Sequence, residues 1–163
     1  MTQKFPFMPL HPKHMKIRTA GLLSEKSAKF GMTRVRADGT PRAHQGVDLE
    51  IDPGYRVYAV DSGIVAYTEN IRTGYGKQVC IKLNSDLYVF YAHLSRIDVV
   101  ADQKISAGQQ IGLSGSSGNA AGMNNIKQGS HLHFEVRTIS RPGIGLIGRV
   151  DPLPYLTLTS ELE

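Results

Sequence analysis

Two short histidine motifs carry residue types that could hold a catalytic metal ion. In the segment 131–136, the alternation of an extended strand places His131, His133 and Glu135 on one face and apolar side chains on the other. Two imidazoles two residues apart on a strand can converge on one centre, as two ligands or as one ligand beside an acid–base group. An isolated pair of this kind is about as often two ordinary surface histidines, so the motif needs support from elsewhere in the chain.

The second motif places an imidazole and a carboxylate, His44 and Asp48, four residues apart with Gly46 between them. Alone this spacing is weak evidence, because it often arises by chance. Two neutral histidines and one aspartate together make a three-ligand set, which leaves one position of tetrahedral zinc open for water. Such a site keeps a net charge of about +1, which lowers the pKa of the bound water and polarises a carbonyl group.

Short strands are the elements that must position these motifs. From residue 56 onward, short apolar runs alternate with Gly, Asn and Asp, which is typical of an antiparallel β protein with tight turns. The segments 78–83 and 87–93 are predicted to pair as a hairpin, and the second strand delivers His93 at its end. Both faces of that second strand are apolar, which indicates a strand covered on both sides.

Two segments lack such a pattern. Residues 1–43 are rich in Pro, Lys and Arg and are predicted to be irregular, apart from a short helix or strand between Met15 and Phe30. Residues 112–130 are too polar and Gly-rich to belong to the core, and a loop of this length in a small domain is usually functional or disordered. Long helical periodicity is absent, so the expected fold class is mainly β.

The composition indicates one compact domain of 163 residues, with the 40% hydrophobic and 20% charged residues of a soluble globular protein. The single cysteine, Cys80, excludes an internal disulfide and a Cys-rich metal site, so a metal must use His and carboxylate ligands. The formal charge of +5 favours an anionic polymer such as nucleic acid or bacterial wall. The basic residues are scattered and not interleaved with aromatics, which argues against nucleic acid and favours a solvated surface with a mild excess of charge.

Taken jointly, the motifs resemble the lysostaphin-type family of zinc peptidoglycan endopeptidases. The resemblance runs from about Phe30 to Asp151-Pro152 and rests on these segments in order: Phe30-Gly31, His44-x-x-x-Asp48, Tyr91-Ala92-His93-Leu94-Ser95 and His131-x-His133. Three features differ from the familiar pattern, namely a longer Gly-rich loop at 124–128, Ser130 where Pro is common, and an Arg34 spaced one residue further. All three lie beside the expected groove and bear on substrate preference more than on reaction type.

The resemblance implies a fold, a cofactor and a set of roles. One zinc ion would be bound by His44, Asp48 and His133, while His131 and His93 stay off the metal and handle the water and the tetrahedral intermediate. The fold would be an antiparallel β-sheet sandwich with little helix and a groove floored by sheet and walled by loops. The expected reaction is hydrolysis of peptide bonds in the stem peptides or cross-links of bacterial peptidoglycan.

We expect an N-terminal leader of residues 1–29 that packs on the domain, a catalytic domain of residues 30–155 and a C-terminal tail of residues 156–163. The expected protein is a monomer without a membrane span, since no run approaches the ~18 apolar residues of one. No secretory signal opens the chain, so it would reach the periplasm or cell wall, of its own or a target cell, by a route not visible in the sequence. Delivery as a secreted or injected antibacterial toxin would require an immunity or inhibitor protein as a partner.

Two other functions are compatible with parts of the pattern. Two histidines and one carboxylate also form the facial triad of non-haem iron oxygenases, but that triad leaves His93 and His131 without a role. A non-catalytic module on the same fold, which binds the wall or activates other wall enzymes, would need no metal site. Since every ligand and both auxiliary histidines are present, the zinc endopeptidase is the preferred hypothesis.

Overall fold

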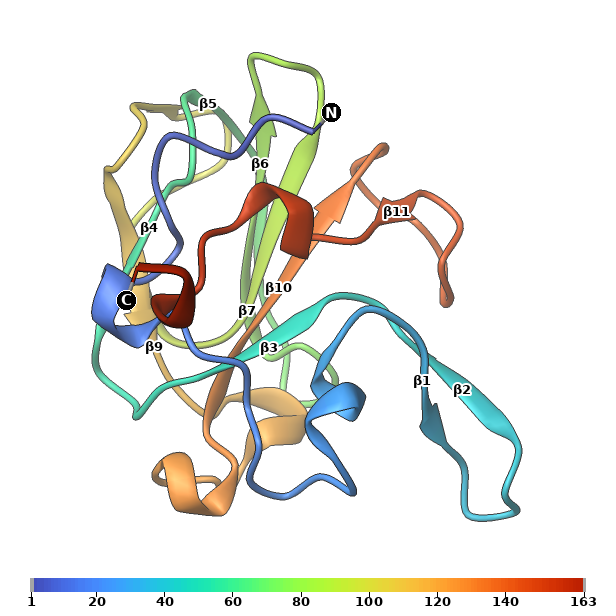
Figure 1. Cartoon of the computed structure of the whole chain (residues 1–163). Helices are drawn as coiled ribbons and strands as arrows, with labels where there is room; N and C mark the ends of the chain where they lie inside the picture. Colours follow the sequence, from blue (N-terminus) through green and yellow to red (C-terminus); the bar gives the residue numbers. More distant parts are fainter. Residues whose placement is uncertain (1, 163) are drawn as a thin grey trace.

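The computed structural model describes residues 2–162, and its regular structure consists mostly of antiparallel strands (Figure 1). The helices in this part of the chain are short 3-10 turns, none of them long or apolar enough to cross a membrane. The mainly β fold with little helix is therefore confirmed. The elements are η1 (Pro12–His14), η2 (Glu25–Ala28), β1 (Gly31–Val35), β2 (Pro41–His44), β3 (Val47–Glu50), β4 (Arg56–Tyr58), β5 (Gly63–Asn70), β6 (Lys77–Leu83), β7 (Tyr88–Ile97), β8 (Lys104–Ile105), β9 (Gln110–Ser114), η3 (Gly118–Ala120), η4 (Ile126–Gln128), β10 (His131–Arg137), β11 (Arg149–Val150), η5 (Leu153–Tyr155) and η6 (Thr159–Leu162).

The main sheet follows the order β11-β10-β7-β6-β5-β8, with β3 added beside β10 and with β9 joining β7 to β4. Strands β1 and β2 form a separate two-stranded sheet, which projects from the body of the molecule next to β3 (Figure 1). The central strands β10 and β7 are neighbours in the sheet. They carry three of the histidines of the sequence motifs, His131, His133 and His93.

The predicted hairpin of residues 78–93 is present as β6 and β7. A tight turn closes it, in which the amide of Leu83 donates to the carbonyl of Leu87 and Asp86 has a left-handed backbone with φ of 72°. Strand β7 is buried on both faces, as its composition predicted, because Tyr91 packs in the main core while Phe90 packs with Cys80 in a second cluster. The β7 strand does not end at His93 but continues to Ile97.

The prediction that residues 1–43 are irregular is wrong for the hairpin of β1 and β2. A turn at Asp38 and Gly39 connects the two strands, where the Asp38 carboxylate accepts from the Thr40 amide and Gly39 has a φ of 87°. Polar and apolar residues are mixed along both short strands, and Met32 and Val35 are exposed, so the hairpin lacks the apolar alternation that reveals a half-buried strand. Between Met15 and Phe30 the chain forms η2 and one isolated bridge from Ile17 to Leu49.

Both ends of the described chain contribute to one core, which includes Phe5, Leu10, Met15 and Leu156. The boundaries drawn at residues 29 and 155 stay a prediction. The Gly-rich segment 112–130 was predicted to lie outside the core, but its first residues belong to the buried strand β9. Glycine is required there, because a Cβ at Gly112 would lie 2.4 Å from the carbonyl oxygen of Arg96 on β7.

Candidate metal centre

Three potential ligands converge from three strands, the neighbouring β2 and β3 and the distant β10. The register of the antiparallel pair β3–β10 places His133 directly opposite Asp48, and His44 is the last residue of β2. The chain bends between them at Gly46, where a Cβ would lie 2.3 Å from the carbonyl oxygen of Phe134. Any side chain at this position would therefore push the bend away from β10 and separate His44 from the other two residues.

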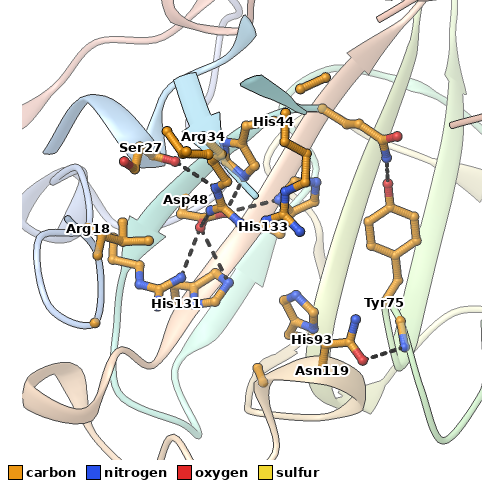
Figure 2. Close-up of a pocket in the computed structure, with 18 of the residues that line it drawn as sticks. Arg18, Ser27, Arg34, His44, Asp48, Tyr75, His93, Asn119, His131 and His133 are labelled. Carbon is orange, nitrogen blue, oxygen red and sulfur yellow. Dashed lines mark hydrogen bonds and ion pairs between the residues drawn. The ribbon is translucent and has the colours of Figure 1, made fainter. Parts of the chain in front are cut away.

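The ligand atoms of His44, Asp48 and His133 all lie within 4.8 Å of one another, and the three side chains are buried (Figure 2). The Oδ1 atom of Asp48 lies 3.1 Å from Nε2 of His44 and 3.0 Å from Nδ1 of His133. Bonds of about 2.0–2.1 Å to a tetrahedral zinc separate neighbouring ligand atoms by about 3.3 Å. The two observed distances are close to two edges of that tetrahedron.

Hydrogen bonds at the far side of each ring indicate which nitrogen faces the centre. The carbonyl of Lys29 accepts from Nδ1 of His44 at 3.0 Å, and the carboxylate of Glu135 accepts from Nε2 of His133 at 2.8 Å. With the protons assigned to those atoms, His44 and His133 both direct a lone pair at Asp48. Three buried acceptors at this spacing repel one another unless a cation lies between them, so the donor set suits a divalent metal ion.

The demand of this site for positive charge is also visible in its pKa values. Burial disfavours the charged ring of His133, but hydrogen bonds with Asp48 and Glu135 outweigh burial and raise its pKa to about 9. Burial also disfavours the carboxylate of Asp48, yet the nearby His131, His133 and His44 hold the pKa of Asp48 well below its usual range. A metal cation and a proton compete for the same place, which makes metal binding depend on pH.

Two arginines hold the second oxygen of Asp48. Its Oδ2 atom accepts from Arg18 at 3.1 Å and from Arg34 at 2.8 Å, and Arg34 also donates to the carbonyl of Ser27 at 2.9 Å. Arg18 is buried and Arg34 is mostly so. These bonds turn the carboxylate so that Oδ1 faces the two histidines, and they keep Asp48 ionised inside the protein.

His93 and His131 lie beside the ligand cluster with their rings 5.0 Å apart, and the ring of His93 is 6.2 Å from that of His133. In each ring Nδ1 is bonded to a backbone carbonyl, that of Ser117 for His93 at 2.8 Å and that of Gly129 for His131 at 2.7 Å. Burial lowers the pKa of His93 to about 3 and that of His131 to about 4. Both rings are therefore neutral near pH 7 and keep Nε2 available as a proton acceptor.

The backbone at His93 adopts an unusual conformation that aims its side chain. Its φ is 60°, in the left-handed region that non-glycine residues rarely occupy. The register of β7 shifts just beyond this point, and the amide of His93 donates to the carbonyl of Tyr75 instead of to a neighbouring strand. Such strain is typical of functional sites and persists only where the surrounding structure imposes it.

A buried network supports His133 from behind. The carboxylate of Glu135, which is fully buried, accepts from His133, from the hydroxyl of Tyr75 at 2.6 Å, and from Nε of Arg137 and Arg149 at 2.8 and 2.6 Å. The side-chain amide of Gln45 extends the network, since it donates to the Tyr75 hydroxyl and its oxygen accepts from the amide of Gly145. A carboxylate behind a ligating histidine fixes its ring orientation and raises its basicity.

The five residues predicted from the sequence are thus brought together, although their roles stay predictions. The sequence placed Glu135 on the same face as His131 and His133 without giving it a role, and alternation was the signal that could have provided one. The contacts of Arg18, Arg34 and Tyr75 were missed. Arg34 was noted only for its spacing after Phe30-Gly31, and no motif marks Arg18 or Tyr75, because both reach the site from loops.

The centre opens into a cleft of about 950 Å³, at the large end of the range for ligand sites. His44, His93, His131 and His133 are among its lining residues, and so are side chains from the β1–β2 hairpin and from the loops that carry Tyr75, Asn119 and Gly145. Figure 2 shows His93 and Asn119 on one side of the cleft, facing the cluster around Asp48. The cleft can admit an extended chain to the open side of the ligand cluster.

The fold and this ligand set together define a lysostaphin-type metallopeptidase domain. The chain belongs to peptidase family M23, whose model matches residues 42–143. The outer membrane antigenic lipoprotein B of Haemophilus influenzae is 36% identical over 117 residues, 72% of this chain and 25% of the relative. The murein hydrolase activator NlpD of Escherichia coli K12 is 33% identical over 113 residues (69% and 26%), and the peptidoglycan DD-endopeptidase ShyA of Vibrio cholerae is 37% identical over 99 residues (61% and 21%).

Among solved structures, the catalytic domain of the antimicrobial peptidase lysostaphin from Staphylococcus simulans superposes with a TM-score of 0.60 at 27% identity. The match covers 78% of this chain and 87% of that domain. The curated relatives are longer proteins, of which this chain spans about a quarter. The residues that match the family model, 42–143, include His44, Asp48 and His133.

Proposed function

We propose that the chain is a zinc-dependent endopeptidase that hydrolyses peptide bonds in the stem peptides or cross-links of bacterial peptidoglycan. One observation carries the proposal: His44, Asp48 and His133 direct three acceptors at one point, and two neutral histidines lie beside it. A metal-binding module without activity would need the three acceptors but not the two neutral histidines. Among the relatives, ShyA is a peptidoglycan DD-endopeptidase, which supports the substrate class.

His44, Asp48 and His133 would hold the zinc ion, which when bound supplies the Lewis acidity that polarises a peptide carbonyl and acidifies a water. His93 and His131 can accept a proton from the attacking water at Nε2, because both rings are neutral and have Nδ1 engaged. A ring that has taken up the proton becomes a donor, which can stabilise an oxyanion or protonate the leaving amine. Arg18 and Arg34 hold Asp48 ionised throughout.

The decisive test compares zinc content with cleavage in matched histidine variants. Purified sacculi are digested, released fragments are identified by mass spectrometry, and zinc is measured by atomic absorption. His93→Ala is expected to keep one zinc and lose about 10²- to 10⁴-fold in rate, the usual contribution of acid–base assistance. His44→Ala is expected to lose the zinc itself, while His11→Ala, an exposed histidine outside the cleft, changes neither. Near-normal turnover by His93→Ala would remove the role given to that residue.

A second function is favoured by one comparison, because the relative NlpD is a murein hydrolase activator. An activator would release no fragments from sacculi by itself when loaded with zinc, but would increase the rate of an added murein hydrolase. His93→Ala would then activate as well as the unaltered protein. Fragments that appear without any added enzyme, and that vanish with His93→Ala, favour the peptidase.

The place of action follows from the substrate. We propose that the protein acts in the periplasm or cell wall, and the relatives named outer membrane lipoprotein and murein hydrolase activator support that setting. The wall attacked would belong to the cell itself or to a rival, in which case the protein is an antibacterial toxin with a dedicated immunity protein. Expression in the periplasm of a host that lacks such a protein distinguishes the two, since a toxin would lyse that host and a regulated wall enzyme would not.

A further inference from the structure

The hairpin of β1 and β2 presents three arginines to the cleft on one face. Arg34 and Arg42 are directly paired across the two strands. Arg36 lies two residues beyond Arg34, just past the end of β1, where its amide donates to the Thr40 carbonyl and continues the pairing of the hairpin. His44 is likewise two residues from Arg42 on β2. Arg34, Arg36, Arg42 and His44 all line the cleft, so this face of the hairpin extends the wall of the metal centre outward.

A single carboxylate opposes this concentration of positive charge among the described residues that line the cleft. Like charges opposite each other on two strands are destabilising, and Arg42 and Arg18 both contribute to the lowered pKa of Arg34, after its burial. Among the described residues that line the cleft, Asp48 is the only carboxylate. Both Arg18 and Arg34 already bind it.

Arg36 and Arg42 are the two arginines of the cleft that do not bind Asp48. Both are exposed, and neither forms an ion pair within residues 2–162. The guanidinium of Arg36 donates to the Pro41 carbonyl and to the Thr40 hydroxyl on its own hairpin, which holds it in place. Two guanidinium groups that line the same cleft without an ion pair of their own are well suited to a carboxylate, which arginine binds through two parallel N–H donors.

We infer that Arg36 and Arg42 form a subsite for a free carboxylate of the substrate peptide, and that the enzyme prefers stem peptides with a free carboxylate near the cleaved bond over neutral glycine bridges. The inference rests on the proposed function. Arg42 lies about 6.7 Å along β2 from His44, and an extended peptide advances about 3.3–3.4 Å per residue. The carboxylate that the arginines bind therefore lies about two residues from the cleaved bond, at a position such as the free carboxylate of diaminopimelate.

The test uses two synthetic cross-linked peptides that are identical except that diaminopimelate carries a carboxylate in one and a carboxamide in the other. Zinc-loaded protein is expected to prefer the acid by about tenfold in kcat/KM, the size expected of an exposed charge-assisted pair, with most of the difference in KM. In the variant with both Arg36→Gln and Arg42→Gln, the ratio of kcat/KM for the acid to kcat/KM for the amide is expected to fall to about one. Replacing Arg42→Gln by Arg42→Lys in that variant is expected to restore part of the preference. Arg56→Gln, an exposed arginine that does not line the cleft, keeps the full ratio.

The outcomes separate the subsite from the activity. Cleavage of both peptides at equal rates by the unaltered protein overturns the subsite and leaves the peptidase intact. Cleavage of neither peptide overturns the proposed function, and calorimetry with the same two peptides then tests the subsite alone. Tighter binding of the acid that disappears in the double variant supports the subsite, and equal binding of acid and amide overturns it.

Discussion

Glu135→Gln tests whether the buried network behind His133 determines metal binding. The substitution keeps the shape of the side chain but removes its charge, and an NH2 group replaces one of its two oxygens. Oε1 of Glu135 accepts from Arg137 and Arg149, and Oε2 accepts from His133 and Tyr75. Whichever oxygen is replaced, two donors lose their acceptor and face another donor instead.

The cost is large because two buried guanidinium groups lose their counter-charge. Removal of one partner of a buried ion pair costs about 3–5 kcal/mol. For a chain of this size each kcal/mol lowers Tm by about 2–4 °C, so a decrease of about 6–20 °C is expected. Zinc affinity should fall by about 10- to 100-fold, the usual effect of losing the group that orients a ligating histidine.

Thermal unfolding of the metal-free protein gives the first quantity, and competition with a chromophoric chelator gives the second. Glu69→Gln is the matched control, since it makes the same change in the exposed pair of Glu69 with Arg141, which is worth about 0–1 kcal/mol. Tyr75→Phe removes only one of the donors to Glu135. It takes the place of Glu135→Gln in both measurements if that variant does not fold. If Glu135→Gln has the same melting temperature as Glu69→Gln and binds zinc as tightly as the unaltered protein, the buried network does not determine metal binding.

Two further predictions concern the bend that carries the ligands and the neutral histidines. Gly46→Ala should destabilise the fold and weaken zinc binding, because its Cβ would lie 2.3 Å from the Phe134 carbonyl oxygen. The control Gly143→Ala, whose Cβ meets nothing within 4 Å, should have neither effect. Equal melting temperatures and zinc affinities for the two variants would contradict this prediction. Metal-free protein should lose stability as pH falls from about 6.5 toward 4.5, since His93 and His131 have folded pKa values of about 3 and 4 and an ordinary value of 6.5, so that the unfolded chain binds more protons in this range. A melting temperature that does not change between these pH values would contradict the prediction. So would a His93→Gln variant whose melting temperature depends on pH as steeply as that of the unaltered protein.

Local periodicity was enough to predict the parts of the site that lie on one regular strand. The alternation of β10 placed His131 and His133 on one face, and the turn chemistry after β6 located the hairpin that leads to His93. The continuation of β7 past His93 was missed, because a left-handed φ at a histidine leaves no signature in a hydrophobic pattern. The prediction of a strand was therefore correct, and its predicted end was wrong at the residue where the chain is strained.

The convergence of β3 with β10 could not be derived from spacing alone. His44 and Asp48 are close in sequence, but Asp48 and His133 are 85 positions apart and are brought together only by the register of two distant strands. A single sequence without related chains does not specify such a pairing, and only the resemblance to a known family supplied it. The hairpin of β1 and β2 was not predicted for a different reason. Its side chains line the cleft and are mostly not buried in the core, so they leave no hydrophobic pattern in the sequence.

That hairpin changes what the net charge of the protein means. From the sequence, nineteen basic residues scattered along the chain indicated only a solvated surface with a mild excess of charge. In the folded protein, four of them, Arg18, Arg34, Arg36 and Arg42, come together at one cleft. A bound divalent ion would add to them, and Asp48 alone opposes them among the described lining residues. Charge focused in a cleft attracts an anionic chain far more effectively than the same charge spread over a surface, so the location of these arginines, more than the total of +5, favours the capture of an anionic polymer.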